Sequence, residues 1–221
     1  MTTSIPVSSL PARWYHDPQI YKHERQHIFA RHWLVFARES QLQQNGSYVA
    51  ANIAGWPVMA VRDNHGQLRA FHNLCRHRAA PVLINTAGHC EQLRCPYHGW
   101  TYNLDGQLRY APGFEFDTGN FDQSTMGLLE VRLACWNGIV FICFDNDAED
   151  LQTWLGDIIS IAADFPAVTE MAFHRELVNE GHVNWKAYSD NSAEGYHLGS
   201  VHPSLSSALL RERTAVSYTH L

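Results

Sequence analysis

Two short segments within residues 75–100 carry the side chains best suited to hold a metal. They read Cys-Arg-His from Cys75 to His77 and Cys-Pro-Tyr-His from Cys95 to His98. Two thiolates and two imidazoles suit either a tetrahedral zinc ion or a [2Fe-2S] cluster in which histidines replace two of the cysteines. A zinc finger usually pairs cysteine with cysteine and histidine with histidine, whereas each segment here offers one of each. The spacing therefore favours the iron–sulfur cluster, and structural zinc is the alternative.

In such a Rieske cluster the thiolates hold one iron and the imidazoles hold the other. We therefore expect Cys75 and Cys95 to be buried behind the loops. The added electron resides on the histidine side, so the outer nitrogens of His77 and His98 are the expected exit for electrons.

Four other residues near these segments or on strand-like runs have a simpler interpretation. Tyr97 and Trp100 are expected to pack around the cluster and to restrict water, which tunes its potential. Cys135 and Cys143 lie on apolar, strand-like runs, so we predict that both are core thiols. Five cysteines at irregular spacing argue against a disulfide framework.

A second group of potential ligands follows in the sequence Glu-Gly-Tyr-His-x4-His, from Glu194 to His202. His197 and His202 do not share a helical face as a four-residue spacing would allow, but a helix break at Gly199 can turn one back toward the other. Two histidines and a carboxylate form the facial triad of non-haem Fe(II) oxygenases, which leaves positions open for O2 and substrate. A histidine pair alone is a weak signal. Its presence in the same chain as the cluster pattern favours an Fe(II) site.

The composition restricts the partners and the location. The formal net charge is −6 without a basic block, so we expect no nucleic-acid partner and no attachment to an anionic membrane. The first residues lack the pattern of a secretory signal, and the longest apolar run, 139–144, is too short to span a bilayer. We therefore expect a cytoplasmic protein.

The first two thirds of the chain read as one helix followed by strands. Asp17-Pro18 is a helix-start signal, and the apolar spacing after it predicts an amphipathic helix over residues 18–32. An Asp-Gly hairpin is expected at 103–108. Strands are predicted at residues 47–53, 57–62, 68–73, 128–134 and 139–144.

The period changes again near residue 147. Apolar residues on one helical face predict a helix of about four turns over 151–162. A weak alternation predicts a strand over 173–182, and a helix is expected over 184–198, ended by Gly199 and Pro203. The expected domains are therefore an N-terminal helical segment (1–45), a cluster domain (46–146) and a further domain that begins at 147 and runs to 221.

The two ligand patterns together resemble the catalytic α subunit of Rieske non-haem iron oxygenases, the ring-hydroxylating oxygenase family. The resemblance covers nearly the whole chain: a Tyr-x-x-Glu helix at Tyr21 and Glu24, both cluster loops, Asn-Trp-Lys at 184–186, and the motif at 194–202. It implies a mostly β Rieske domain, an antiparallel β-sandwich with two cluster-binding loops. An N-terminal helix would precede this domain, and the start of an α+β catalytic domain would follow it.

The resemblance also implies roles for individual residues. His197 and His202 would bind the mononuclear iron. Glu194 stands three positions before the first iron histidine, where the family carries an acidic residue that bridges electron transfer between cluster and iron across a subunit contact. Asn191 matches a family asparagine near the iron. Glutamate rather than aspartate at 194 looks more like the branch that acts on quaternary ammonium compounds such as choline, carnitine or betaine.

The implied activity is that of a mono- or dioxygenase. NAD(P)H would supply electrons through a separate reductase or ferredoxin to the [2Fe-2S] cluster and then to Fe(II), where O2 is activated to hydroxylate or oxidatively demethylate a small organic substrate. The full-length protein would be a homotrimer. The third iron ligand of the family is a later carboxylate, and only Glu212 follows Glu194 here. The chain is therefore expected to be an incomplete, inactive N-terminal fragment.

Two other classes compete with this interpretation. A stand-alone Rieske ferredoxin would carry electrons without a substrate of its own, but it would need neither the helix after Asp147 nor His197 and His202. A zinc-binding interaction module would use the four cluster residues only.

Overall fold

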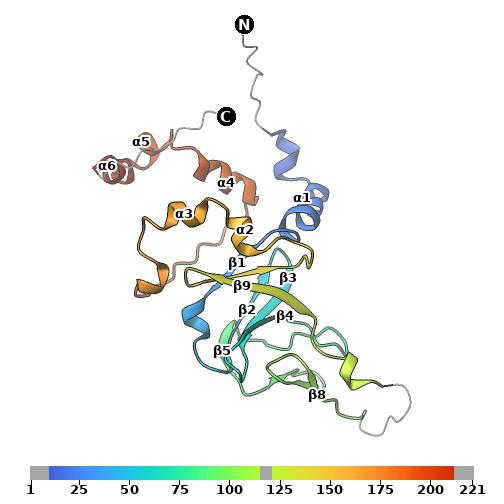
Figure 1. The fold of residues 1–221 in the computed structure, drawn as a ribbon. Coiled ribbons are helices and arrows are strands. Elements are labelled where there is room, and N and C mark those ends of the chain that lie inside the picture. The colour runs from blue at the N-terminus through green and yellow to red at the C-terminus, as the bar shows by residue number, and fades with distance from the viewer. Residues whose placement is uncertain (1–9, 115–120, 212–221) are drawn as a thin grey trace. The chain divides into compact units, whose positions relative to one another are not determined.

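The computed structural model of the chain describes residues 10–114 and 121–211 and divides the molecule into two compact units (Figure 1). The sheet unit comprises residues 23–174. The helical unit comprises residues 1–22 together with 175–221, within the described range. Each unit is described separately below.

All paired strands of the sheet unit are antiparallel, and they form a seven-stranded and a three-stranded sheet. The order in the larger sheet is β1-β10-β9-β4-β3-β2-β5, and in the smaller one β6-β7-β8. The strands are β1 (Leu34–Arg38), β2 (Ser47–Ile53), β3 (Trp56–Arg62), β4 (Leu68–His72), β5 (Ala87–His89), β6 (Leu93–Arg94), β7 (Thr101–Tyr102), β8 (Leu108–Tyr110), β9 (Glu130–Trp136) and β10 (Ile139–Cys143).

Strand β3 separates two hydrophobic cores. Because side chains alternate across a strand, Met59 and Val61 face one core while Val58 and Ala60 face the other, and all four are fully buried. The first core also contains Cys75, Cys95 and Trp100. The expected cluster loops are therefore attached to the interior of the sheet unit.

The helical elements are short, and most of them lie near the ends of the chain. They are η1 (Ala12–Tyr15), α1 (Pro18–Glu24), the π-helical turn η2 (Arg25–Phe29), η3 (Glu39–Leu42), η4 (Gln123–Thr125), α2 (Leu151–Leu155), α3 (Ile158–Ala162), η5 (Val168–Glu170), α4 (Trp185–Ala193), α5 (Leu198–Val201) and α6 (Pro203–Arg211). Leu151 and Leu155 of α2 pack with Trp33, Phe141 and Cys143 in a third core.

The mostly β fold with a helix before it is confirmed, and the predicted strands agree with the observed ones within about two residues. The Asp17 carboxylate accepts the N–H of Gln19 at 2.9 Å, as the helix-start signal predicts. The first helix is shorter than predicted: α1 ends at Glu24, and the π-helical turn η2 that continues it ends at Phe29.

Two predictions between residues 151 and 182 are wrong. The single helix over 151–162 is divided into α2 and α3, because Gly156 adopts a positive φ of 51° and ends α2. Residues 173–182 form no strand. Phe173 and Val178 are more than half exposed there, so the weak alternation has no partner strand to pair with.

The helix predicted over 184–198 is also divided. It begins at Trp185 as expected but ends at Ala193, and Glu194 is extended. Gly199 lies inside α5 instead of ending a helix, and Pro203 begins α6, a position that suits proline because the first helical N–H has no intrahelical partner. The break still occurs within the predicted iron motif.

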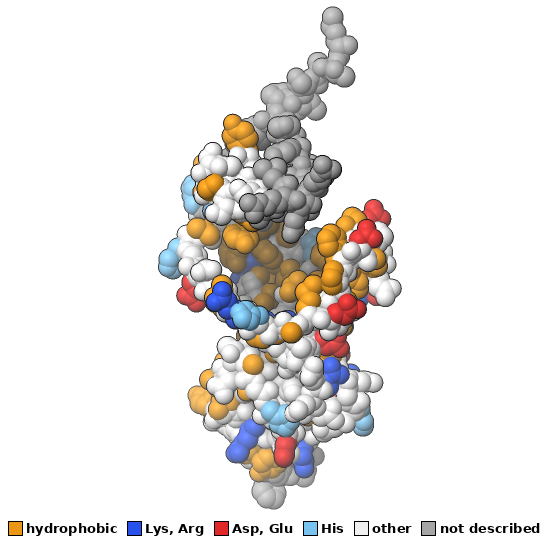
Figure 2. All heavy atoms as spheres, turned by 90° about the vertical axis from the view of Figure 1, so that its left-hand side faces the viewer, with side chains coloured by type: hydrophobic (Ala, Val, Ile, Leu, Met, Phe, Trp, Pro, Cys, Tyr) orange, Lys and Arg blue, Asp and Glu red, His pale blue; other side chains and the backbone are white. Residues whose placement is uncertain are grey.

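Many large hydrophobic side chains from residue 158 onward are exposed, among them Phe165, Leu177 and Tyr196. On the face shown in Figure 2, hydrophobic side chains form several patches, whereas the lowest part of the view is more polar. Within the described ranges, no helix has the length and hydrophobicity needed to cross a membrane.

Candidate metal centres

The two cluster loops follow β4 and lie between β6 and β7, and they share one backbone conformation. In the first loop the N–H of Ala79 donates to the carbonyl of Cys75, and the N–H of Cys75 donates to the carbonyl of Ala80, both at 2.8 Å. The second loop repeats both bonds from Cys95, with Gly99 at 3.0 Å and Trp100 at 2.8 Å.

The fourth residue after each cysteine adopts a positive φ, 55° at Ala79 and 76° at Gly99. A positive φ is unusual for alanine because its Cβ crowds the backbone. The two loops thus share the same backbone conformation. Their histidines differ in position: one follows its cysteine by two residues and the other by three.

The four predicted ligands are brought together as two pairs. Cys75 and Cys95 are buried, at 3% and 1% exposure, as predicted. Burial is the main cause that raises the pKa of the Cys95 thiol, and a side-chain contact with Cys75 also raises it, so the two sulfurs are neighbours. The ring centroids of His77 and His98 lie 4.6 Å apart, and His98 is exposed. The thiols are thus buried, His77 is partly buried and His98 is exposed.

The Nδ1 atom of His77 is buried and has no hydrogen-bond partner. A buried nitrogen without a hydrogen-bond partner is energetically costly, and a metal bound to this nitrogen would satisfy it. Burial is the main cause that lowers the pKa of His77, and electrostatic interactions with His98 and Arg78 lower it further, which favours the neutral imidazole that binds metals. These residues therefore fit a [2Fe-2S] cluster, which needs two protein ligands on each iron.

The part of the chain that the structure describes contains no three His, Cys, Asp or Glu side chains placed to hold one metal ion. The paired arrangement of two thiols and two imidazoles is the arrangement that a two-iron cluster uses.

Aromatic side chains surround the imidazole pair. Trp100 is 3% exposed and stacks on His77, with 5.1 Å between centroids and 6° between planes. The Phe114 ring meets the rings of His77 and Trp100 edge-on. Tyr97 lies beside His98, with centroids 3.8 Å apart, but is 61% exposed. Trp100 therefore shields the imidazole pair from water. Tyr97 covers only part of the His98 ring and is itself exposed to water.

Two supporting residues were missed by the sequence reasoning. The first is Tyr102, which is fully buried with its hydroxyl 3.2 Å from the sulfur of Cys75. The N–H of Arg76 donates to the same hydroxyl at 3.0 Å, which leaves the O–H to donate toward the sulfur. Burial, and next the contact with Cys75, raises the pKa of Tyr102, so it stays a neutral donor.

The second missed residue is Asn73, which is buried just before the first loop. Its Oδ1 accepts the N–H groups of Val82 and Leu83 at 3.0 and 2.9 Å, and its Nδ2 donates to the carbonyl of Leu83 at 2.8 Å. Asn73 thereby ties the start of the loop segment to its far end. A polar residue at the end of a buried strand was the available signal.

In the helical unit the structure brings His197 and His202 together, with ring centroids 5.5 Å apart. One oxygen of Glu194 contacts Nδ1 of His197, and the other accepts the N–H of Tyr196 at 2.7 Å. The hydrogen bond with His197 is the main cause that lowers the pKa of Glu194. Asn191 lies on α4 and is exposed. The motif therefore forms a small polar cluster at the break between α4 and α5.

Helix α4, which precedes the motif, is held at both ends. The side chain of Asn184 caps it by accepting the N–H of Lys186 at 3.1 Å. The hydroxyl of Tyr15 donates to Asp190 at 2.5 Å, and the Lys186 ammonium lies 5.8 Å from the Tyr15 ring. The N-terminal segment is thus attached to the helix that precedes the iron motif.

Two cysteines outside the loops, Cys135 and Cys143, differ in their burial. Cys143 on β10 is fully buried, as predicted. Cys135 on β9 is exposed, so the prediction of a core thiol is wrong there, because its position on the strand points outward.

Comparison with known proteins gives two family matches. Residues 32–120 match the model of the Rieske [2Fe-2S] domain, and residues 168–220 match the catalytic domain of the ring-hydroxylating α subunit. The carnitine monooxygenase oxygenase subunit of Escherichia coli K12 is 33% identical over 206 residues, which are 93% of this chain and 55% of that protein. The glycine betaine monooxygenase oxygenase subunit of Chromohalobacter salexigens is 33% identical over 91% of this chain and 45% of that protein.

Solved structures give the same result. The quaternary ammonium Rieske monooxygenase CntA, in complex with L-carnitine, superposes with a TM-score of 0.83 at 30% identity, over 90% of this chain and 56% of that one. Naphthalene 1,2-dioxygenase with indole bound superposes with a TM-score of 0.73 at 31% identity, over 88% and 44%. The chain spans about half the length of the relatives it matches.

The sheet unit and its paired loops define a Rieske-type iron–sulfur protein. Because the match to the α-subunit catalytic domain follows in the same chain, the chain belongs to the α-subunit family of Rieske non-haem iron oxygenases. The cofactors of this family are a Rieske [2Fe-2S] cluster and Fe(II). The alternative of a stand-alone ferredoxin is excluded by the second match.

Proposed function

We propose that this chain receives electrons from a reductase at its [2Fe-2S] cluster and delivers them to a mononuclear Fe(II) site for the oxygenation of a small organic substrate. One observation carries the proposal: the same chain contains two Cys/His loops on a buried core and, in its helical unit, two histidines that lie next to each other beside a carboxylate. When bound, the iron supplies O2 activation, and the cluster supplies the electrons one at a time.

The residue roles follow from the two groups of side chains. Cys75 and Cys95 would hold one iron of the cluster, and His77 and His98 the other. The structure supports this assignment through the buried thiols and the unpartnered Nδ1 of His77.

In the helical unit, His197 and His202 would hold the mononuclear iron, with a carboxylate as third ligand. Glu194 would bridge electron transfer between the two centres, and Asn191 would lie near the iron. The contact of Glu194 with His197 supports the bridging role, because it connects the carboxylate directly to a proposed ligand.

A quaternary ammonium compound is the proposed substrate class. Relatives that act on carnitine and glycine betaine support it, as does glutamate at position 194. The proposed reaction hydroxylates an N-methyl group: O2, two electrons and two protons give the N-hydroxymethyl product and water, and that product then releases formaldehyde. The electrons would come from NAD(P)H through a separate reductase or ferredoxin.

The proposal includes an assembly and a location. A homotrimer in the cytoplasm is the expected form, and inter-subunit electron transfer is described for the similar quaternary ammonium Rieske monooxygenase. The predicted domain division at residues 45 and 146 also stays part of the proposal.

The experiments use the full-length enzyme expected to contain this sequence, which is purified anaerobically and supplied with Fe(II), a Rieske-oxygenase reductase, NADH, O2 and glycine betaine. We expect formaldehyde release that requires every component and that a His197→Ala, His202→Ala variant abolishes. 3,3-Dimethylbutanoate has the shape of glycine betaine without the cationic nitrogen, so it serves as the control substrate. Equal formaldehyde release by the double variant would contradict the assignment of these histidines.

Glu194→Gln isolates the bridging role. This variant should keep both metals but slow the reoxidation of the reduced cluster in a single turnover. Asp190→Asn on the same helix is the matched control, since it removes a carboxylate that binds Tyr15 instead of His197. An unchanged rate in Glu194→Gln would remove Glu194 from the electron path.

A further inference from the structure

A third pair of histidines, His23 and His27, belongs to neither metal centre. His23 lies on α1 and His27 in the π-helical turn η2, and both are exposed residues of the sheet unit. Their ring centroids lie 5.9 Å apart, with 14° between the ring planes. The corresponding centroid distance is 4.6 Å in the cluster loops and 5.5 Å in the iron motif. The third pair is thus nearly as close as the two pairs assigned to iron.

The backbone places these two rings on one side of the helix. In an α-helix of about 3.6 residues per turn, a residue four positions further on is rotated about 40° past the first. Turn η2 begins at Arg25, between the histidines, and the N–H of Ala30 donates to the carbonyl of Arg25 at 2.9 Å. This bond closes a wider π turn, which reduces the rotation, and such turns are frequent at functional sites. His27 therefore lies nearly in line with His23, which explains the almost parallel rings.

The separation of the rings suits one shared metal ion. Zinc binds a histidine nitrogen at about 2.0–2.1 Å and so lies about 3 Å from the ring centroid, which lets two rings share an ion up to a centroid separation of about 6 Å. The observed 5.9 Å is at the upper end of this range. Because both side chains are exposed, small rotations about their side-chain bonds would bring the ring nitrogens closer together.

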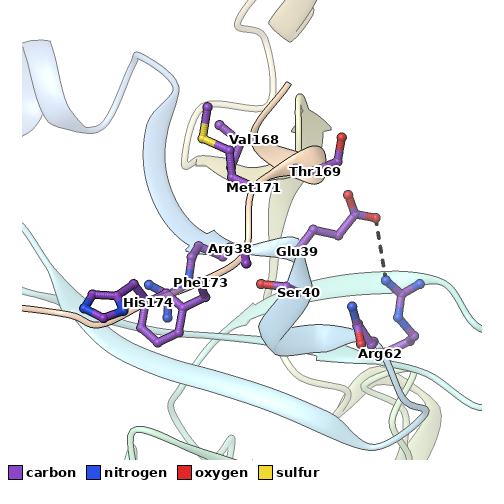
Figure 3. Close-up of a pocket in the computed structure, with 12 residues that line it drawn as sticks. Arg38, Glu39, Ser40, Arg62, Val168, Thr169, Met171, Phe173 and His174 are labelled. Atoms are coloured by element: carbon purple, nitrogen blue, oxygen red, sulfur yellow. Dashed lines mark ion pairs between the residues drawn. The ribbon is translucent and has the colours of Figure 1, made fainter. Parts of the chain in front are cut away.

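Neither ring is engaged elsewhere in the described part of the chain. There, the side chains of His23 and His27 make no hydrogen bond, ion pair or ring contact besides the one with each other. The pocket at the end of β1 differs in this respect, because its Glu39 is paired with Nη2 of Arg62 at 3.8 Å (Figure 3). The imidazole nitrogens of the pair are therefore accessible to a ligand from solution.

The sequence from His23 to His27 also matches His-Glu-x-x-His, the helical pattern with which zinc hydrolases hold their metal. The glutamate of that pattern acts as a general base. Here Glu24 is 6% exposed and has an interaction of its own, whereas both histidines are exposed, so we assign it no such role. Within residues 10–114 and 121–211, no three His, Cys, Asp or Glu side chains are grouped to hold one ion. The pair thus supplies two ligands, and water supplies the others.

We propose that His23 and His27 together bind one divalent transition-metal ion of the zinc, nickel or copper type. Imidazole suits these ions, whereas Mg²⁺ and Ca²⁺ prefer oxygen ligands. The bound ion would connect α1 to η2 across the start of the π turn. The site uses no residue of the cluster loops or of the iron motif, so it does not depend on the proposed function.

Calorimetric titration of the purified protein with its cluster bound tests the proposal, with Zn²⁺ as the probe. A His23→Ala, His27→Ala variant should bind one Zn²⁺ fewer per chain than the unaltered protein. This difference cancels any Zn²⁺ bound elsewhere, such as at the iron motif. In the unaltered protein, Zn²⁺ should shift the imidazole nitrogen resonances of both histidines in nuclear magnetic resonance spectra, and Mg²⁺ should not.

A change of position separates shared binding from the mere number of histidines. Gln26→His, His27→Gln keeps the composition but moves one imidazole by about 100° around the helix. It should weaken Zn²⁺ binding at this site by at least about tenfold, because the second imidazole no longer binds the same ion intramolecularly. His65→Ala removes an exposed histidine from the β3–β4 turn and should change nothing.

The substituted residues are exposed, so the variants should keep their fold, and circular dichroism checks this. Three results would overturn the proposal. They are an equal number of bound Zn²⁺ ions in the double-alanine variant, an unchanged affinity after the change of position, and equal resonance shifts with Mg²⁺.

Discussion

The cluster loops and the iron motif carry similar side chains in contrasting surroundings. Cys75 and Cys95 are at most 3% exposed and belong to the first core of the sheet unit. In the iron motif the Glu194 side chain is 48% exposed and Tyr196 is 91% exposed. One site is part of a hydrophobic core, and the other is on a surface.

The difference teaches how each site is positioned. The cluster loops are held by contacts that reach beyond each short loop, from Asn73, Trp100 and Tyr102. The iron motif is arranged by contacts within a few residues, such as those of Glu194 with Tyr196 and His197. Substitutions in the first site should therefore disturb the fold as well as the metal, whereas those in the second should act on the metal alone.

The largest contrast is expected from removing one ligand at each site. Cys95→Ala should abolish the visible absorption and the electron paramagnetic resonance signal of the dithionite-reduced cluster, because the thiolate is one of two ligands on its iron. His197→Ala should leave both signals and the sulfide content unchanged. A cluster signal lost equally in the two variants would show that the sites are not independent.

Removing an aromatic side chain should separate the sites by stability. Trp100→Ala should lower the free energy of unfolding by about 3–5 kcal/mol, because it deletes a large buried ring that stacks on His77. Tyr196→Ala should change it by less than about 0.5 kcal/mol, since that ring is exposed. Denaturant titration measures both, and a similar cost for the two would contradict the comparison.

Substitution of two asparagines, one in each unit, compares the stability of the two sites with the same residue type. Asn73→Ala breaks three buried hydrogen bonds, so we expect a loss of about 2–3 kcal/mol. Asn184→Ala removes one helix cap and should cost about 1 kcal/mol. Amide hydrogen exchange assigns each loss to its unit: protection should fall around Val82 and Leu83 in the first variant and along α4 in the second.

The sequence was sufficient for the parts of the molecule that local pattern determines. The apolar run of β3 and the Asp-Gly hairpin before β8 predicted strands, and the loop spacing predicted the ligand pairs. It was insufficient where distant residues decide the outcome. Tyr102 meets Cys75 across 27 positions, which no local pattern encodes.

The helical predictions failed for a related reason. The apolar face over 151–162 is compatible with one helix, but Gly156 adopts a positive φ that ends it. The alternation over 173–182 describes a strand that has no neighbour to pair with. Periodicity records which residues can form an element, whereas the partner that stabilises the element lies elsewhere in the chain.

The smallest effect is expected from a single hydroxyl. The O–H of Tyr102 points toward the sulfur of Cys75, and a hydrogen bond to a thiolate ligand stabilises the reduced cluster more than the oxidised one, because the reduced form carries more negative charge. Tyr102→Phe should therefore lower the reduction potential by about 40 mV, which corresponds to roughly 1 kcal/mol for one electron. Protein-film voltammetry measures this shift, and Tyr188→Phe on the exposed face of α4 is the control that should leave the potential unchanged. An unchanged potential in Tyr102→Phe would mean that the core supports the loops sterically but does not tune the reduction potential of the cluster. The cluster loops would then differ from the iron motif only in how tightly their side chains are packed.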